Sequence, residues 1–288
     1  MKLIVNITSI MLLILSAAGS IEAQSLPTDS DSQPARLGEY NNFDTSIMEC
    51  VYEHATYDPI KKSTQCTDWI LEIGKNGSKY GLYPTYQCDS IINADYNGKP
   101  TRGEYYAVAN KFETTKLTEQ IKNLSENKFK NYESIFMDWY YYEEPIPQIE
   151  WNLVAGTDEI CGHECKKATT TFRGRNWTAW YTEEIPIDNG PWKFGCLPGL
   201  ILKVEDDRKE HVFEALQLRK SSREFGNFIH SFIITTDRQK FNKMMRDYKW
   251  DAGSFIGNTP NMPTALDGTP AIKKNTRLFY NPIELDWE

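Results

Sequence analysis

The sequence predicts a mainly β fold of the α+β class, with a curved antiparallel sheet that forms a half-barrel and one or two packing helices. Short runs of aromatic and β-branched residues, such as Trp177–Thr182 and Leu200–Val204, suit a pleated, half-buried surface. Turn residues separate such runs, as at Lys75-Asn76-Gly77 and Arg173-Gly174-Arg175. No helical pattern alternates with the runs, so neighbouring strands are expected to be antiparallel.

The chain of 288 residues is expected to contain a targeting segment, a leader and one domain. Residues 1–23 have an apolar centre, Ile10–Leu15, followed by small residues, which is typical of a cleavable signal peptide. That apolar run is much shorter than the roughly 20 residues that span a bilayer, so no membrane anchor is expected. Residues 24–42 are polar and predict a flexible leader. Residues 43–288 form the single predicted domain.

Within this domain, a first strand is expected over Ser46–Tyr57 and a hairpin over Gln65–Tyr83, followed by a short helix over Tyr86–Tyr96. Tyr105–Asn127 is expected to be a helical or irregular insertion. Further short strands are expected over Phe129–Met137, Trp139–Glu144, Gln148–Val154, Ile160–Phe172, Asn176–Thr182, Gly199–Glu205 and His211–Leu218.

Two segments are expected after these strands. Apolar residues at helical spacing predict a helix over Thr236–Lys249, capped by Thr236 or Asp237. Leu278–Leu285 is expected to be an edge strand or a tail.

The loop Pro186–Gly199 is both stiff and apolar. Its prolines and glycines limit its shapes, and Leu197-Pro198-Gly199-Leu200 predicts a type II turn. Three large apolar side chains, Trp192, Phe194 and Leu197, lie close together in it. Because a solvated loop does not favour such side chains, we predict that the loop folds back and packs against the sheet as a lid.

Several motifs around this loop resemble the GLPGLI family of Gram-negative envelope proteins. The resemblance extends over roughly Trp151–Asp207. It implies a location in the cell envelope and a fold, but no enzymatic reaction. The first glycine of the name motif is Cys196 in this chain. The order of elements is also similar to that of LolA/LolB-like lipoprotein carriers. The motifs that carry the resemblance are Cys165–Ala168, Phe172–Arg175, Ala179–Thr182, Ile185-Pro186, Gly190–Phe194 and Leu197–Ile201.

A sheet that curls without closing leaves a concave apolar face, which a helix, a loop or a ligand must fill. With the implied envelope address, this predicts an exported, non-enzymatic binding protein of the periplasm or envelope. Its ligand is expected to be apolar or peptide-like, or a segment of an outer-membrane or periplasmic partner. Candidate ligand or lid residues are Trp180, Trp192, Phe194, Leu197, Arg173 and Arg175.

The two arginines among these candidates have a second interpretation. Paired guanidinium donors suit an anionic ligand. More often, however, arginines beside a strand turn pair with nearby carboxylates, and Glu183 and Glu184 are the candidates for that role.

Charge and motifs exclude several classes of protein. The net charge of −8 argues against a nucleic-acid partner, because phosphates require clustered lysine and arginine. The sequence has no HExxH helix, G-x-S-x-G elbow, Walker A loop or G-x-G-x-x-G fingerprint. We therefore predict no enzyme, no catalytic residue and no cofactor, with a hydrolase built from residues far apart in sequence kept as a further hypothesis.

The cysteines offer two interpretations, since thiols in an exported protein tend to pair. Cys161 and Cys196 both depart from the pattern of the family that the chain resembles, which makes them candidates for a disulfide. Alternatively, Cys161, His163 and Cys165 would share one face of a strand and bind zinc or copper, with His211 or Glu164 as a further ligand. This periplasmic metal or redox protein is the alternative function.

Overall fold

The computed structural model describes residues 31–35, 37, 39–112, 118–229, 232–257 and 272–286. The chain forms two compact units. The sheet unit comprises Gly38–Tyr83, Leu117–Met244 and Phe279–Glu288, and the helical unit comprises Met1–Leu37, Pro84–Lys116 and Met245–Leu278. The predicted signal peptide lies outside the described residues.

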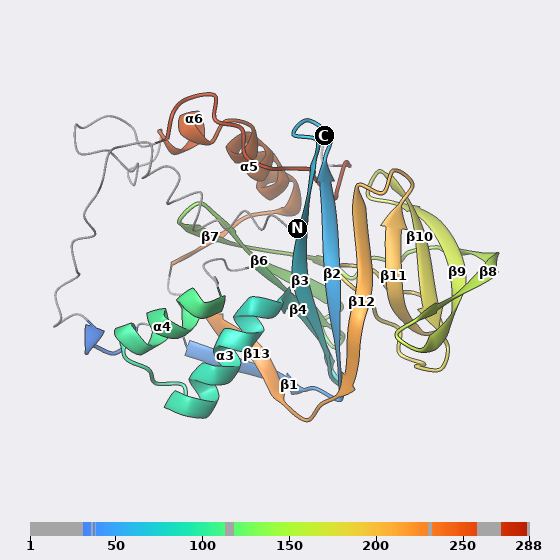
Figure 1. Cartoon of the computed structure of the whole chain (residues 1–288), viewed down its shortest axis with the longest axis horizontal. Helices are drawn as coiled ribbons and strands as arrows, with labels where there is room; N and C mark the ends of the chain where they lie inside the picture. Colours follow the sequence, from blue (N-terminus) through green and yellow to red (C-terminus); the bar gives the residue numbers. More distant parts are fainter. Residues whose placement is uncertain are drawn as a thin grey trace. The chain divides into compact units, whose positions relative to one another are not determined.

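A 12-stranded sheet dominates the described part of the sheet unit, in the order β14-β7-β6-β5-β4-β3-β2-β12-β11-β10-β9-β8 (Figure 1). All neighbours are antiparallel except β14 and β7, which are parallel. The two end strands do not pair with each other, so the sheet is open, and the predicted fold class is confirmed. The strands are β2 (Met48–Asp58), β3 (Ser63–Ile73), β4 (Gly77–Leu82), β5 (Thr118–Asn123), β6 (Lys128–Ile135), β7 (Asp138–Pro145), β8 (Asn152–Ile160), β9 (His163–Phe172), β10 (Arg175–Thr182), β11 (Leu200–Asp206), β12 (His211–Lys220) and β14 (Ile233–Thr235).

Two-residue turns set the register of the hairpins at the β8 end of the sheet. Arg173 and Gly174 join β9 to β10 with φ values of 52° and 78°, the positive values that a type I′ turn requires at both positions. Cys161 and Gly162, with φ values of 53° and 78°, join β8 to β9 in the same way.

The core shows that the sheet bends around one of its faces. Tyr52 and Leu71, from the middle of the sheet, belong to the same buried cluster as Trp177 and Ala179 from β10. The segment between β10 and β11 contributes Trp192, Phe194 and Leu197 to that cluster. One face of the sheet and this segment therefore form a common core.

A second, two-stranded sheet pairs β1 (Glu39–Thr45) with β13 (Glu224–Ile229). The Lys79 Nζ of β4 donates to the Gly226 carbonyl of β13 at 2.7 Å, so this sheet contacts the 12-stranded sheet. The sequence predicts a flexible leader over residues 24–42, but residues 39–42 belong to β1, because a partner distant in sequence completes the strand pair.

The described part of the helical unit contains α3 (Tyr83–Tyr96), which confirms the predicted helix, and α4 (Arg102–Phe112). Thr101 and Glu104 form a capping box, with the Thr101 N–H donating to Glu104 Oε2 at 2.7 Å and the Glu104 N–H to Thr101 Oγ1 at 3.3 Å. The small core of these helices contains Cys88, Ile92, Val108 and Ala109.

Two further helices follow the strands, α5 (Arg238–Trp250) and α6 (Ala252–Ile256). Asp237 Oδ1 accepts the Lys240 N–H at 2.8 Å at the start of α5, as the predicted cap requires. None of the described helices is long and apolar enough to cross a membrane.

Candidate binding site

Polar side chains gather on one face of strands β2 to β6, which we call the inner face. Tyr52 lies opposite Trp69, Tyr80 opposite Gln120, and Gln120 opposite Asn131. Cross-strand partners project to the same side of a sheet. The indole of Trp69 also stacks on the ring of Tyr80, with centroids 5.0 Å apart and planes 7° from parallel. These residues therefore line one continuous surface.

Three buried polar atoms on the inner face have no hydrogen-bond partner within the described structure: Trp69 Nε1, Tyr80 Oη and Gln120 Oε1. Their neighbours are satisfied, because Gln120 Nε2 donates to Asn131 Oδ1 at 3.0 Å and Tyr52 Oη to the Ile201 carbonyl at 2.7 Å. A buried polar group without a partner costs about 1–3 kcal/mol. Three such atoms on one surface are therefore a costly arrangement for a purely structural core.

The chemistry of the three atoms is complementary. Burial raises the pKa of Tyr80 well above its ordinary value, so its hydroxyl stays protonated and available as a donor. The Trp69 indole is also a donor, whereas Gln120 Oε1 is an acceptor. The surface thus offers two donors and one acceptor beside stacked aromatic rings. It matches a molecule with an apolar body and a group that both accepts and donates hydrogen bonds.

The segment Pro186–Gly199 packs against the sheet, as expected for the loop. Phe194 is 1% exposed, and its ring lies 4.9 Å from that of Trp177 in an edge arrangement. Trp192 lies 5.2 Å from Phe194, and Leu197 is buried with them. These residues fill part of the common core, so burying their apolar surface stabilises the fold. Their assignment to a ligand lid stays a prediction.

Polar contacts hold this segment to the inner face. Lys122, from β5, donates from Nζ to the Asp188 carbonyl at 3.2 Å, and the Trp151 indole donates to the Gly195 carbonyl at 2.8 Å. The predicted type II turn is wrong, because Gly199 does not have a positive φ. Glycine is required there for another reason: an added Cβ would lie 2.0 Å from the Thr182 carbonyl oxygen.

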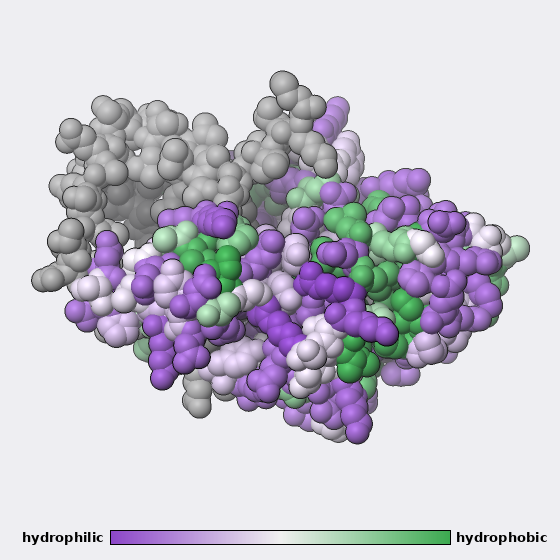
Figure 2. Space-filling view, turned by 60° about the horizontal axis from the view of Figure 1, so that its bottom comes forward, coloured by the Kyte–Doolittle hydropathy of each residue, from purple (hydrophilic) through white to green (hydrophobic). Residues whose placement is uncertain are grey.

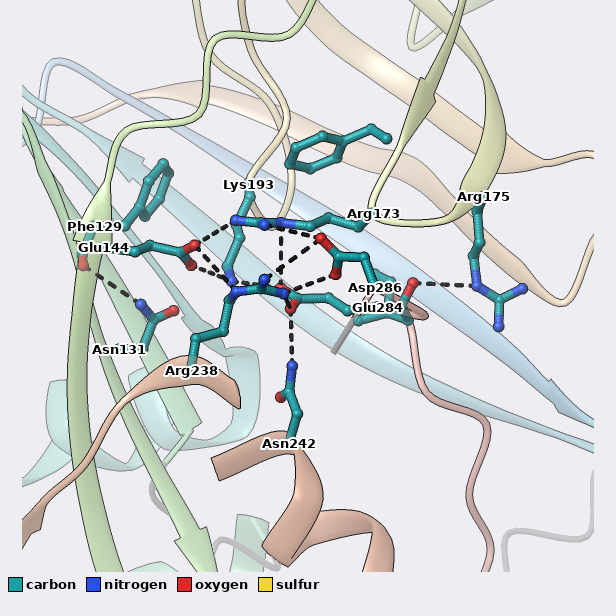
Figure 3. A network of polar contacts seen from close by, with 12 residues as sticks. Phe129, Asn131, Glu144, Arg173, Arg175, Lys193, Arg238, Asn242, Glu284 and Asp286 are labelled. Atoms are coloured by element: carbon teal, nitrogen blue, oxygen red, sulfur yellow. Dashed lines mark hydrogen bonds and ion pairs between the residues drawn. The ribbon is translucent and has the colours of Figure 1, made fainter. Parts of the chain in front are cut away.

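A buried network of charges fixes the middle of the segment (Figure 3). The Lys193 side chain is 1% exposed and forms ion pairs with Glu144 and Glu284. Arg173 and Arg238 approach the same carboxylates and Asp286. Three cations thus meet three carboxylates, which compensates charges that would be very costly to bury alone.

The electrostatics of Glu284 follow from its neighbours. Burial acts to raise the pKa of Glu284, but Lys193, Arg238 and Arg173 outweigh it and lower that pKa to about 2. The Asn242 side chain also donates to Glu284 at 2.9 Å. Leu278–Leu285, expected to be an edge strand or a tail, forms no strand. The ion pairs of Glu284 with Lys193 and Arg238 hold its end.

Arg175 holds the preceding part of the C-terminal segment. Its guanidinium pairs with Asp206 at 2.7 Å and Glu210 at 2.9 Å, and it donates to Asn281 Oδ1 and the Pro282 carbonyl at 2.8 and 2.7 Å. The arginines of the β9–β10 turn thus have carboxylate partners, but not the predicted ones. Glu183 pairs with Lys166, and Glu184 with His163.

Trp180 is placed apart from the other candidate lid residues. It alternates along β10 with the buried Trp177 and Ala179, so it projects to the other face. There its ring lies 5.5 Å from the ammonium groups of both Lys167 and Lys203. The structure brings Trp192, Phe194 and Leu197 together, with Arg173 in the neighbouring network, but it separates Trp180 from them.

The cysteine cluster is not assembled. Cys161 lies in a turn, not on a strand, so the alternation that would have aligned it with His163 and Cys165 does not apply. Its Sγ donates to the Ala215 carbonyl at 3.1 Å, whereas His163 Nδ1 lies 2.6 Å from Glu184. Among the described residues, no group of three His, Cys, Asp or Glu side chains is arranged to hold a metal ion.

The expected Cys161–Cys196 disulfide is absent as well. No disulfide joins any of the six cysteines, all of which lie in the described part of the chain. Cys196 contacts the Pro147 carbonyl and the Ile149 N–H instead. The structure places Cys161 beside β12 and Cys196 beside residues 147–149, which explains why the two do not pair.

The residues with unpartnered atoms were not among the predicted site residues. Trp69 and Tyr80 lie on a correctly predicted hairpin, but the turn residues that predict the hairpin do not indicate which of its polar atoms are buried without a partner. Gln120 belongs to β5, within the segment expected to be an insertion. Its polar sequence, Thr118–Asn123, gave no indication of a buried strand.

A family model described as "Protein of unknown function (Porph_ging)" matches residues 170–203. This match confirms the resemblance predicted for the region, because the family carries the GLPGLI motif in envelope proteins. The matched segment includes β10, the buried loop and the start of β11. No curated protein matches the chain.

Among solved structures, the chain is similar to PNGF-II in two crystal forms, with 16% identity and TM-scores of 0.47 and 0.48. Each match covers 72% of this chain and 34% of the other, so the chain spans about a third of the length of those structures. A LolA superfamily protein from Nitrosomonas europaea matches with 10% identity and a TM-score of 0.26, covering 72% of this chain and 96% of the other.

Proposed function

We propose that this chain is an exported, non-enzymatic binding protein of the cell envelope, which holds an apolar or peptide-like ligand on its inner sheet face. The proposal starts from the match of residues 170–203 to an envelope family and from the predicted signal peptide. The observation that carries it is the set of unpartnered buried atoms of Trp69, Tyr80 and Gln120. A ligand would complete their hydrogen bonds.

The expected ligand has an apolar body that lies against the aromatic rings and a head that is both acceptor and donor. An amide, a protonated carboxyl or a hydroxyl has this character, so a fatty acid and a short apolar peptide are both suitable. The buried loop Pro186–Gly199 would bound the site through Lys122, which joins it to the inner face.

The proposal is tested with N-phenyl-1-naphthylamine, a dye that fluoresces when it is buried, and with palmitic acid as its competitor. Tyr80→Phe and Gln120→Leu should each lower the affinity for palmitic acid by about tenfold, because each loses one hydrogen bond to the head group. Tyr80→Phe should also melt higher than the wild type without ligand, since an unsatisfied buried group is removed. Gln120→Leu should not, because it also breaks the hydrogen bond from Gln120 Nε2 to the buried Asn131.

Tyr106→Phe is the matched control, since Tyr106 is 54% exposed in the helical unit. It should change neither affinity nor melting temperature. If Tyr80→Phe instead lowered the melting temperature and left dye and fatty-acid binding unchanged, an ordered water would be the partner of that hydroxyl, and the proposal would be refuted.

A further inference from the structure

The end strand β8 has one edge that no strand in the described part of the chain pairs with. It pairs with β9 on one side and is the last strand of the 12-stranded sheet (Figure 1). All its residues from Asn152 to Glu159 are exposed. An exposed edge presents backbone N–H and C=O groups that accept a further strand.

The features that commonly protect an edge strand are sparse on β8. It is nine residues long and contains neither proline nor lysine. Leu153 is 65% exposed and Val154 39% exposed, so its first half is apolar. Its protective features are a register irregularity between Val154 and Thr157, where Gly156 lies, and the exposed charges of Asp158 and Glu159. By contrast, the opposite end strand, β14, has only three residues.

The second half of β8 is acidic. Asp158 and Glu159 are exposed, and Glu164 continues the acidic surface on β9. The nearby lysines are already engaged, since Lys166 pairs with Glu183 at 2.7 Å and Lys167 lies over the Trp180 ring at 5.5 Å. The edge thus combines an apolar half with an acidic half.

The surface colouring agrees with this description. Rotation about the horizontal axis keeps β8 at the right-hand end of the molecule, and Figure 2 shows weakly apolar surface there, bordered by polar surface.

We propose that β8 binds an extended segment of another protein as an added antiparallel strand, independently of the inner-face ligand. The segment would have one or two lysine or arginine residues followed by alternating apolar residues. In an antiparallel pair, its basic start lies beside Asp158 and Glu159, and its apolar part lies beside Leu153 and Val154. Backbone hydrogen bonds would provide affinity, and the two halves of the edge would provide direction.

A second copy of this chain fits the edge poorly. Antiparallel pairing of two β8 strands about a twofold axis through Gly156 would place Leu153 of one copy opposite Glu159 of the other. The acidic halves would find no cation, and each copy carries a net charge of −8. Such pairing is therefore disfavoured by both apolar burial and repulsion.

The test uses two labelled synthetic peptides of about ten residues, a usual strand length with short ends, which alternate threonine and valine. One begins with two lysines and the other with two glutamates. Fluorescence anisotropy should show that the lysine peptide binds the wild-type chain at least tenfold more tightly. Leu153→Lys, at an exposed position, should weaken that binding by about tenfold through loss of apolar contact and added repulsion.

The decisive variant is Asp158→Lys with Glu159→Lys, which should reverse the preference between the two peptides. A misfolded double variant would lose binding of both peptides, so a reversed preference cannot result from misfolding. Equal binding of both peptides to the wild type, or an unchanged preference in the double variant, would overturn the proposal. So would a wild-type dimer in sedimentation that Leu153→Lys converts to a monomer, because the occupant would then be a second copy.

Discussion

At the scale of single residues, the face of β2 to β5 that lies opposite the inner face buries acidic side chains as well as apolar ones. Glu49 lies directly opposite Glu72 across the β2–β3 pair, and both are buried. Arg219 and Ser221 satisfy Glu49, at 2.6 and 2.7 Å. Burial raises the pKa of Glu72 to about 7, in spite of the opposing charges of Lys79 and Arg223.

We predict that Glu72→Gln stabilises the protein above neutral pH. The folded state binds this proton more tightly than the unfolded state, so stability falls as pH rises from 4.5 to 7. The expected gain at pH 8 is at most about 3 kcal/mol, and the gain should vanish near pH 4. Urea unfolding at both pH values measures it, with Glu53→Gln as the control. A variant that is equally stable to wild type at pH 8 would contradict the expected burial of a charged carboxylate.

At the scale of elements, the segment between β10 and β11 depends on close approaches of the backbone. Gly199 lies against the Thr182 carbonyl, so this contact and not a turn type determines the residue. Gly162, in the β8–β9 turn, has a φ of 78° but no atom within 4 Å of an added Cβ. Substitution of Gly199 therefore tests the effect of a steric clash, whereas substitution of Gly162 tests the effect of a positive φ alone.

We predict that Gly199→Ala destabilises the protein by about 3 kcal/mol, because the new methyl group displaces the buried segment. Gly162→Ala should cost only about 1 kcal/mol, the penalty for a left-handed conformation without a clash. Thermal unfolding of both variants provides the measurement. If the two losses were equal, the segment would not be packed as tightly against β10 as described.

The alternation and turn chemistry of the sequence were enough to predict local structure but not long-range packing. The Arg173-Gly174 turn, α3 and the cap of α5 follow from neighbouring residues, and all three are present. By contrast, β5 is polar yet buried, because β1 and β13 contact the side of the sheet that its alternate residues face. The carboxylate partners of Arg173 and Arg175 lie between 29 and 113 residues away, so sequence proximity to Glu183 and Glu184 was misleading.

At the scale of the whole molecule, a histidine pair joins β2 to β12, with His211 buried and His54 half-buried. His54 and His211 lie 3.1 Å apart between Nε2 and Nδ1, beside Trp177 and Phe213. Burial, and then the charge of Arg175, lower the pKa of His211 to about 3. Burial and His211 lower the pKa of His54 well below its ordinary value.

We predict that the free energy of unfolding falls by several kcal/mol as pH decreases from 6.5 toward 3. In this window the unfolded state binds more protons than the folded state, so each unit of pH lost reduces stability. His211→Gln should flatten the dependence, because it removes one of the two imidazoles whose pKa is lowered. Guanidinium unfolding between pH 6.5 and pH 3 measures this dependence. If the free energy of unfolding of the wild type did not change with pH, the imidazoles would be accessible to protons in the native state.

The charge network around Lys193 also has a consequence for the order of folding. Lys193 and Glu284 are 91 residues apart, and until the later residue emerges, the ammonium group has only Glu144 as a close anionic partner. A growing chain therefore gains little charge compensation from burying Lys193 before Glu284 has been made. Under the proposed export, this delay would keep the chain extended enough for translocation until its distal carboxylates complete the fold.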